Sequence, residues 1–566
     1  MLNKILRVDL TSRKVSEQEL QDSYAHLGGR GLIARILSDE VGAQCDPLSP
    51  QNKLIFACGL LAGTTLSCSN RISVGCKSPL TGGVKESSGG GQCGMFLAQL
   101  GYRAIVIEGA SEELCLLEVN ETGIELKNAG YLKGKGVFET ADLLFSEYPA
   151  STSLSIIGPA GEHMYNIAGI GHTDIDGMPT RCSARGGVGA VMGSKRLKAV
   201  VIPKPARKCP PPADIVLWDS SARQFARLLL DGESTGNTMP KYGTAMTLEL
   251  LLGLGGLPTR NFSEGSFEKA HDIGGTAMHK LISDRGGEGK TTHACMAGCV
   301  VRCSNRFADR SGKLVNSPTE YETLAFLGSN ISVGDLDQIA VLNSICNDIG
   351  ADTIETGGAI AAAMSAGVIA FGDYEGTVGL LAQLRDNSGL GELLGAGAAV
   401  TAAHYGVRSL TARGQTIGAY DPRAVKSNGV TYFTSPQGGD HTTGNGVFSK
   451  VDHHDPNGAV TLSRNLQIVS NWIDSLGICT FARVIHMQDN SVFPGLLNAR
   501  YGWDWTADDL TDLGRAVIRC ELAFNRAAGQ PDVLRPPGYL ETDKLPPYGC
   551  LWDVPFDEMS SIWDDI

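Results

Sequence analysis

Three cysteines occur within one short stretch, Cys295-Met-Ala-Gly-Cys299-Val-Val-Arg-Cys303. Thiolates that bind one metal cluster restrict the fold around them, because all of them must reach the same point. Such a site is rarely preformed in an unfolded chain, so the fold has to create it. This stretch therefore constrains the architecture more than any other. We interpret it as the anchor of an iron–sulfur cluster, and three alternatives must be weighed against that interpretation.

The alternatives are structural zinc, an adenosylmethionine radical enzyme and simple buried thiols. Zinc usually takes two close ligand pairs, and the chain has no second Cys-x2-4-Cys pair. Radical enzymes of that class typically have Cys-x3-Cys-x2-Cys and a parallel β/α barrel, which the order of strands and helices here does not suggest. Buried thiols at i, i+4 and i+8 on one helix face remain open. The spacing favours an iron–sulfur cluster.

A short pattern occurs twice, as Asn347-Asp-Ile-Gly-Ala-Asp352 and as Asp474-Ser-Leu-Gly-Ile-Cys479. In each copy the glycine can end a helix, and the Asx side chain can accept hydrogen bonds from a heterocyclic ligand. Helix C-capping is the simpler interpretation; two related ligand sites are the other. Because a cubane cluster takes four thiolates, Cys479 is the expected fourth partner of the three clustered cysteines.

The first part of the chain predicts a β-rich domain. Short apolar or alternating runs that are closed by polar or glycine residues are typical of strands. They cover residues 5–10, 53–57, 104–109 and 154–158. Glycine clusters at 28–31, 87–94 and 184–195 are candidate cradles for phosphates or heterocycles, because bare backbone N–H groups can approach an anion there. The third cluster matches neither the dinucleotide fingerprint nor the P-loop.

The proline-rich segment 203–213 cannot continue a helix or a central strand, and the periodicity becomes helical after it. Apolar spacing predicts helices over 335–347, 353–370 and 392–405. A second break is expected near 410–420. We therefore predict an α+β fold with a β-rich domain at 1–205 and two mainly helical domains at 206–415 and 416–566.

Charge and cysteine usage exclude several classes of function. The formal net charge of −13, without a long basic run, argues against nucleic acid and against an anionic membrane as partners. No apolar run reaches the roughly 20 residues of a spanning helix, and no signal peptide is visible at the start. Fifteen cysteines in such a chain indicate reduced thiols and metal ligation. A cytoplasmic location is expected.

Several further motifs occur in a characteristic order. They include Gly28-Gly-Arg-Gly, Ser78-Pro-Leu-Thr-Gly, Arg185-Gly-Gly-Val-Gly-Ala-Val-Met-Gly-Ser-Lys, Thr319-Glu-Tyr-Glu-Thr, Ala419-Tyr-Asp-Pro-Arg and Gly439-Asp-His-Thr. Together with the two hexapeptides, they resemble the aldehyde ferredoxin oxidoreductase family of tungsten or molybdenum bis-pyranopterin enzymes over nearly the whole chain. The resemblance implies that the metal–pterin cofactor lies at the interface of the three domains.

The resemblance also implies a set of cofactor-binding residues. Cys295, Cys299, Cys303 and Cys479 would bind a [4Fe–4S] cluster beside a pterin, and the dithiolene sulfurs of the pterins would hold the tungsten or molybdenum. The residues implied near the pterins, their phosphates and a bridging Mg²⁺ are Arg71, Ser88, Gly90, Gly91, Arg181, Ala184, Arg185, Gly186, Asn347, Asp352, Asp474 and Ile478.

For catalysis the resemblance points to Glu320 and His441, with Glu322 as an alternative acid. A buried carboxylate can activate water, and histidine can donate to a carbonyl oxygen as charge develops. The implied reaction converts an aldehyde and water to a carboxylic acid, or the reverse, with electrons passing to ferredoxin or an iron–sulfur subunit. The small-molecule substrate is not identified, and a homodimer is possible.

The chain also departs from the family pattern. The family usually has Cys-x2-Cys-x3-Cys, Asn347 replaces an expected aspartate, and the Glu-x-x-His motif for a metal at the dimer interface is missing from the corresponding region. Two other functions are therefore kept open. One is a tungstopterin subunit of a larger complex that acts on an acyl-CoA or aromatic thioester; the other is a cluster-bearing electron-transfer protein without a metal–pterin.

Overall fold

The computed structural model describes residues 3–566. The chain begins with a six-stranded sheet whose strand order is β2-β1-β6-β3-β4-β5. Strands β1 and β6 pair in parallel, and the other neighbours pair antiparallel. The strands are β1 (Lys4–Asp9), β2 (Lys14–Glu19), β3 (Leu54–Cys58), β4 (Ile72–Lys77), β5 (Val84–Gly89) and β6 (Tyr102–Glu108).

A second six-stranded sheet follows, in the order β11-β10-β9-β12-β7-β8. Its strand β12 pairs in parallel with β7 and antiparallel with β9. The strands are β7 (Cys115–Val119), β8 (Ile124–Asn128), β9 (Ser153–Ile156), β10 (Ile170–His172), β11 (Arg181–Ser183) and β12 (Leu197–Ile202). The runs predicted at 5–10, 53–57, 104–109 and 154–158 are confirmed as β1, β3, β6 and β9.

One apolar core joins the two sheets. It contains Phe56 of the first sheet and Val200 of the second, and both are completely buried. Phe96 of α2 (Cys93–Gln99) and Met192 of α5 (Val188–Ser194) belong to the same cluster. Because burial of apolar surface is the dominant favourable term in folding, this shared core holds the sheets together as one base.

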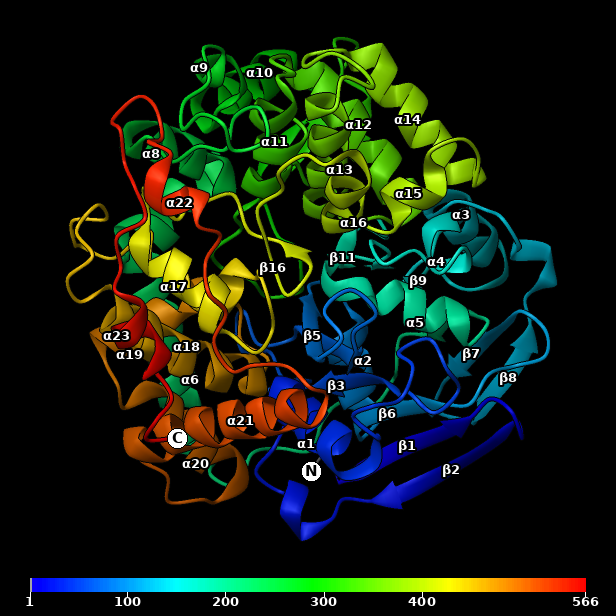
Figure 1. Cartoon of the computed structure of the whole chain (residues 1–566). Helices are drawn as coiled ribbons and strands as arrows, with labels where there is room; N and C mark the ends of the chain where they lie inside the picture. Colours follow the sequence, from blue (N-terminus) through cyan, green and yellow to red (C-terminus); the bar gives the residue numbers. More distant parts are fainter. Residues whose placement is uncertain (1–2) are drawn as a thin grey trace.

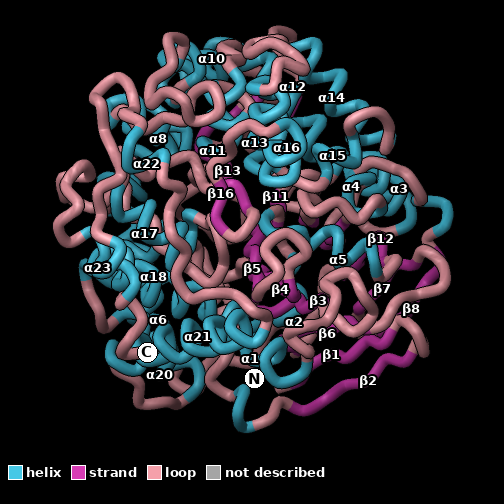
Figure 2. Tube along the Cα trace, in the orientation of Figure 1, coloured by secondary structure: helices cyan, strands magenta, loops and turns pink. Residues whose placement is uncertain are grey.

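Helices dominate the chain after β12, as Figures 1 and 2 show. The predicted order, sheets first and helices afterwards, is confirmed. A small sheet of β13 (Lys290–His293), β14 (Ser304–Ala308) and β15 (Leu314–Asn316) interrupts the helices. The longer helices before residue 405 are α6 (Ile215–Asp231), α8 (Met246–Leu254), α10 (Gly275–Arg285), α12 (Leu336–Ile349), α13 (Thr353–Ser365), α14 (Tyr374–Asp386) and α16 (Ala398–Tyr405).

The predicted helices differ in how well they match. Helix α12 is confirmed, and the Asp335 side chain caps its N-terminus by accepting from two backbone N–H groups. Helix α13 ends five residues before the predicted end, at Ser365 rather than Ala370. The single helix predicted over 392–405 is wrong: α15 (Gly391–Gly395) and α16 are separated at Gly397, whose φ of 102° is not helical. The buried Glu355 carboxylate accepts from Ala398 N at 2.9 Å and caps α16 there.

The last part of the chain returns to the first. Its longer helices are α17 (Lys426–Thr434), α18 (Ala459–Leu476), α20 (Val492–Tyr501) and α21 (Ala507–Ala527). Helix α1 (Gly29–Glu40) packs against α18 and α21, as Figure 1 shows near the N-terminus. Arg30 of α1 binds Glu521 of α21 at 2.7 Å, and both side chains are buried. Within residues 3–566, every helix is too short or too polar to cross a membrane.

Candidate cofactor and cluster site

The three clustered cysteines lie in the loop between β13 and β14, not on a helix. The helix-face interpretation of their spacing is therefore wrong. Cys479 comes directly after the loop that ends α18, at the N-terminus of the short helix η8 (Thr480–Arg483). All four thiols are free and belong to one packing cluster with Met296 and Ile478. The structure thus brings the two cysteine segments together.

Burial raises the pKa of three of these thiols, whereas a hydrogen bond with Cys68 lowers that of Cys299 to about 6. Burial raises the pKa of the Cys295 thiol to about 12, and the neighbouring Cys299 adds to the rise. Burial also raises the pKa of Cys303, with further contributions from Glu320, Cys295, Cys479 and Cys299. Buried thiols of this kind become thiolates when a metal centre offsets their charge. The donor set, four thiols in one packing cluster, fits a [4Fe–4S] cluster.

A single metal ion does not fit the same place. Among the described residues, no three side chains of His, Cys, Asp or Glu converge as the ligands of one ion. A cubane cluster differs in that four thiolates surround a larger body. The cysteine geometry therefore disfavours structural zinc.

The loop after β5 meets the cysteine loop directly. Gly91 N donates to Cys295 O at 3.1 Å, and a Cβ on Gly90 would lie 3.4 Å from Cys295 Sγ. Arg71 N donates to Gly477 O at 3.2 Å, while its guanidinium donates to the carbonyl and hydroxyl of Ser88 at 2.8–3.0 Å. Arg71 thus links β5 of the first sheet to the segment that leads to Cys479.

Arg181 has a different position from the other predicted arginines. Its guanidinium binds Asp174 at 3.0 Å and donates to Ser304 Oγ at 2.7 Å and to Ser317 Oγ at 3.3 Å. Its N–H groups are therefore engaged with the protein itself. Arg181 ties β11 to β14, the strand that follows the cysteine loop.

Arg185 is the predicted residue with unused donors. Its Nη2 donates to the carbonyls of Thr416 and Gly439, and its Nε lies 3.4 Å from Asp352 Oδ2. The Nε and Nη1 atoms, as well as Asp352 Oδ2, are buried without a hydrogen-bond partner. Buried polar groups are rarely left unpaired, so these atoms suit a bound polar ligand. Ala184 and Gly186 flank Arg185 in the same tight turn.

The two hexapeptides are confirmed as helix ends. Gly350 closes α12 and Gly477 closes α18, and both adopt the left-handed conformation of a C-cap. Asn347 Nδ2 donates to Asn316 Oδ1 at 3.0 Å. Burial raises the pKa of Asp474 to about 6, although Arg30 at 3.3 Å lowers it. The two Asx residues thus lie in different polar surroundings.

Glu320 and Glu322 lie at the start of α11 (Tyr321–Phe326). The Glu320 carboxylate accepts a hydrogen bond from the Thr244 hydroxyl. The Glu322 Oε2 atom accepts from Ala419 N at 2.9 Å, and its Oε1 atom lies 3.3 Å from His441 Nε2. Burial raises the pKa of both carboxyl groups. The structure therefore pairs His441 with Glu322 and places Glu320 toward the cysteines.

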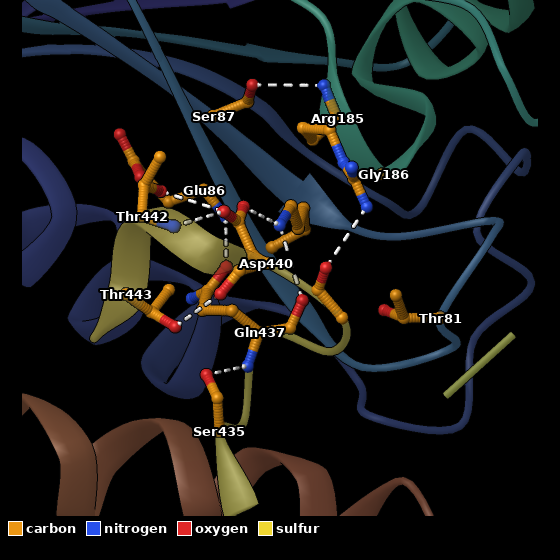
Figure 3. Close-up of polar contacts among 12 residues, drawn as sticks. Thr81, Glu86, Ser87, Arg185, Gly186, Ser435, Gln437, Asp440, Thr442 and Thr443 are labelled. Atoms are coloured by element: carbon orange, nitrogen blue, oxygen red, sulfur yellow. Dashed lines mark hydrogen bonds and ion pairs between the residues drawn. The ribbon is translucent and has the colours of Figure 1, made fainter. Parts of the chain in front are cut away.

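The loop before His441 is held by charged and polar contacts to the first sheet, which Figure 3 shows. Asp440 Oδ2 binds the buried Lys85 Nζ at 2.8 Å, and Asp440 Oδ1 accepts from Thr442 N at 3.0 Å. Gln437 Oε1 accepts from Glu86 N at 2.8 Å. Burial opposes the charge of Asp440, but Lys85 and Arg185 hold its pKa well below the ordinary value. These contacts fix where the His441 ring lies.

Two comparisons of sequence decide the family. Residues 5–204 match the family described as "Aldehyde ferredoxin oxidoreductase, N-terminal domain", and residues 221–555 match "Aldehyde ferredoxin oxidoreductase, domains 2 & 3". The chain belongs to the aldehyde ferredoxin oxidoreductase family. The tungsten-containing aldehyde ferredoxin oxidoreductases of Pyrococcus furiosus and Thermococcus kodakarensis are each 33% identical to it, over 93% of this chain and 89% of theirs.

Two further matches are more distant. A protein of Pyrococcus furiosus described as "Aliphatic sulfonate oxidoreductase, WOR-like subunit" is 27% identical over 94% of this chain and 86% of its own length. The fold matches a chain of the solved active site complex BamBC of benzoyl coenzyme A reductase, with a TM-score of 0.79, over 94% of this chain and 90% of that chain. At 22% identity, that match shows a shared fold.

Sequence reasoning missed several residues of the site. Lys85 and Gln437 lie in no motif, Asp440 was given no role, and only the folded chain brings the three together. Cys68 was not singled out either, although its Sγ lies 3.7 Å from Cys299 Sγ. The sequence held two hints of these residues. The Gly-Asp-His-Thr motif contains Asp440, and Cys68 stands three residues before the predicted site residue Arg71.

Proposed function

We propose that the chain oxidises an aldehyde to a carboxylic acid, or catalyses the reverse reaction, at a tungsten or molybdenum bis-pyranopterin. The relatives at 33% identity are tungsten-containing aldehyde ferredoxin oxidoreductases. The observation that carries the proposal is the set of buried polar atoms without a hydrogen bond on Arg185, Asp352, Glu322 and His441, in a chain that also gathers four thiols. Such atoms are costly to bury unless a ligand completes them.

The residues that would hold the cofactor come from all parts of the chain. Arg71, Ser88, Gly90 and Gly91, with Ala184, Arg185 and Gly186, would bind the pterin phosphates and their Mg²⁺. Asn347 and Asp352 would contact one pterin, and Asp474 and Ile478 the other. Arg181 would support the cofactor site indirectly, through its contacts with Asp174 and Ser304. When bound, the metal–pterin supplies oxygen transfer and the capacity for two electrons.

Glu322 and His441 are the residues best placed to handle protons. Oxidation of an aldehyde and one water gives the acid, two protons and two electrons. A carboxyl group whose pKa is raised by burial can take up a proton from water or from the hydrated aldehyde. His441 Nδ1 is buried without a hydrogen bond, and with both ring nitrogens protonated it can donate to the carbonyl oxygen while Nε2 faces Glu322. Glu320, as the alternative base, lies toward the cysteines.

The [4Fe–4S] cluster on Cys295, Cys299, Cys303 and Cys479 would carry the electrons out one at a time. A surface hollow of about 420 Å³ supports an exit at Cys299. It is lined by that cysteine and by Lys290, Gly298 and Arg302, which are exposed. The chain as a whole carries a net charge of −13, so these local cations favour an acidic ferredoxin or iron–sulfur subunit.

The experiment is aldehyde-dependent reduction of a viologen dye by the protein purified without oxygen. Short aliphatic and aromatic aldehydes should each be tried, with an aromatic acyl-CoA thioester as the rival substrate. Dye reduction with aldehydes, and none without them, is the expected result. Turnover of the thioester alone would instead indicate a tungstopterin subunit that acts on thioesters. Turnover of neither substrate would contradict the proposal.

A further inference from the structure

A fifth cysteine, Cys68, lies against the four cysteines of the proposed cluster. Its Sγ is 3.7 Å from Cys299 Sγ, and the residue is 1% exposed. It belongs to the same apolar cluster as Leu66, Cys299 and Ile478. A cubane cluster takes four thiolates, so a fifth thiol at this distance needs a role of its own.

The backbone fixes Cys68 in this position from two sides. Its carbonyl accepts from Cys479 N at 2.8 Å, and the neighbouring Ser67 Oγ accepts from Val300 N at 3.0 Å. Cys68 itself has a φ of 61°, a conformation that costs energy for any residue with a Cβ. The segment is therefore tied both to the loop of Cys299 and to the segment of Cys479.

The hydrogen bonds around Cys68 have one consistent direction. Ser67 Oγ accepts from Val300 N with one lone pair, and its own hydroxyl hydrogen can point to Cys68 Sγ, 3.3 Å away. The hydrogen of the Cys68 thiol then remains for Cys299. If Cys299 is a cluster thiolate it has no hydrogen to give, so Cys68 must be the donor of the contact at 3.7 Å.

We propose that Cys68 is not a fifth ligand but a positioning residue, which donates its S–H to the sulfur of Cys299 and raises the reduction potential of the cluster. This inference rests on the proposed function, in which the four cysteines bind a [4Fe–4S] cluster. One electron added to the cluster increases the negative charge on its cysteine sulfurs. A donor to one of them stabilises the reduced form, and the apolar surroundings strengthen that effect.

The test compares Cys68→Ala and Cys68→Ser with the control Cys76→Ala in protein purified without oxygen. Cys76 is also buried but lies on β4, in the core between the two sheets. Alanine keeps the Cβ and therefore the backbone strain of Cys68, and serine keeps a hydrogen-bond donor. Iron content and an electron paramagnetic resonance redox titration of the reduced cluster are measured for each variant.

The expected result is unchanged iron in all variants and a cluster potential that is lower in Cys68→Ala than in wild type. Cys68→Ser should lie between the two, and Cys76→Ala should match wild type. Ser67→Ala, which keeps all five cysteines, should also lower the cluster potential, but by less than Cys68→Ala. This variant tests the inference if Cys68→Ala does not fold.

Two results would overturn the inference. Loss of iron in Cys68→Ala that Ser67→Ala does not share would make Cys68 a ligand. Equal potentials in Cys68→Ala, Ser67→Ala and Cys76→Ala would show that no donation tunes the cluster. Wild-type protein without iron would be a different failure, because it would contradict the proposed function itself.

Discussion

Glu320 and Glu322 stand two residues apart at the start of α11, yet their carboxyl groups lie in different surroundings. On the cysteine side, defined by Cys295, Cys299, Cys303 and Cys479, the neighbours are thiols within an apolar core. On the polar side, defined by Arg185, Asp352, Glu322 and His441, several buried polar atoms make no hydrogen bond. This difference suggests that electrons and protons are handled in separate places.

The local backbone directs the side chains of Glu320 and Glu322 to different sides. Glu320 is extended and precedes the helix, whereas Glu322 lies in the first helical turn. Thr244 holds the first carboxylate, and Ala419 N with His441 holds the second. Substitutions on either side should therefore have separable effects.

Replacing a proposed cluster ligand should abolish electron transfer on the cysteine side alone. We expect Cys479→Ser to lose most of its iron and all detectable dye reduction, while tungsten or molybdenum is largely retained. Metal analysis by mass spectrometry measures both. Cys93→Ala, a buried cysteine in α2, is the control and should keep both metals. Full iron content in Cys479→Ser would remove this residue from the ligand set.

The opposite result is expected on the polar side. Arg185→Met removes the buried charge beside Asp352, at 3.4 Å, and the unused donors that suit a phosphate. Removing one partner of a buried ion pair costs about 3–5 kcal/mol, so the melting temperature should fall as well. Metal analysis should show the loss of tungsten or molybdenum with iron retained. Equal loss of both metals would break the proposed separation.

Glu322→Gln should retain both metals and lose turnover. The loss of a general base typically reduces the rate by about 10²–10⁴-fold. Glu320→Gln is the matched control, two residues away and equally buried, and it should retain more activity. Steady-state dye reduction measures both variants. A larger loss in Glu320→Gln than in Glu322→Gln would reverse the assignment of the two acids.

The pH profile sharpens the same assignment. Burial raises the pKa of Glu322 above the ordinary 4.5, so the active carboxylate form is lost as the pH falls through that raised value. The acidic limb of the wild-type rate should therefore lie above pH 4.5 and should be absent from the residual activity of Glu322→Gln. An unchanged acidic limb in that variant would assign the limb to another group.

Charge reversal at the proposed electron exit should have the smallest effect. Lys290→Glu should raise the KM for an acidic ferredoxin a few-fold at low salt and leave viologen reduction unchanged, because only the partner is repelled. Lys14→Glu, an exposed residue on β2, is the control. An equal rise in KM for Lys290→Glu and Lys14→Glu would show that electrons do not leave at the hollow beside Cys299.

The comparison also shows how much of the molecule could be predicted from sequence. Local patterns gave part of the cysteine side: the spacing of three thiols and a repeated hexapeptide pointed to Cys479, which packs in the same cluster, and the hexapeptides predicted the C-caps at Gly350 and Gly477. Strands such as β1 and β3 followed from short apolar runs. These features depend on residues that are close in the chain.

The polar side depends on contacts that no local pattern contains. Glu322 and His441 come from segments far apart in the sequence, as do Lys85 and Asp440, and their pairing appears only in the folded chain. The break between α15 and α16 likewise depends on Glu355, a buried carboxylate from another helix. Cys68 is 231 residues from Cys299 in the sequence, so spacing could not connect them.

A single chain is proposed to hold both a metal–pterin and a cluster. Elemental analysis of the wild-type protein, purified without oxygen, tests this proposal most directly. About one tungsten or molybdenum and about four irons per chain are expected for one such cofactor and one cubane cluster. Iron without tungsten or molybdenum would contradict the account and would favour an electron-transfer protein instead.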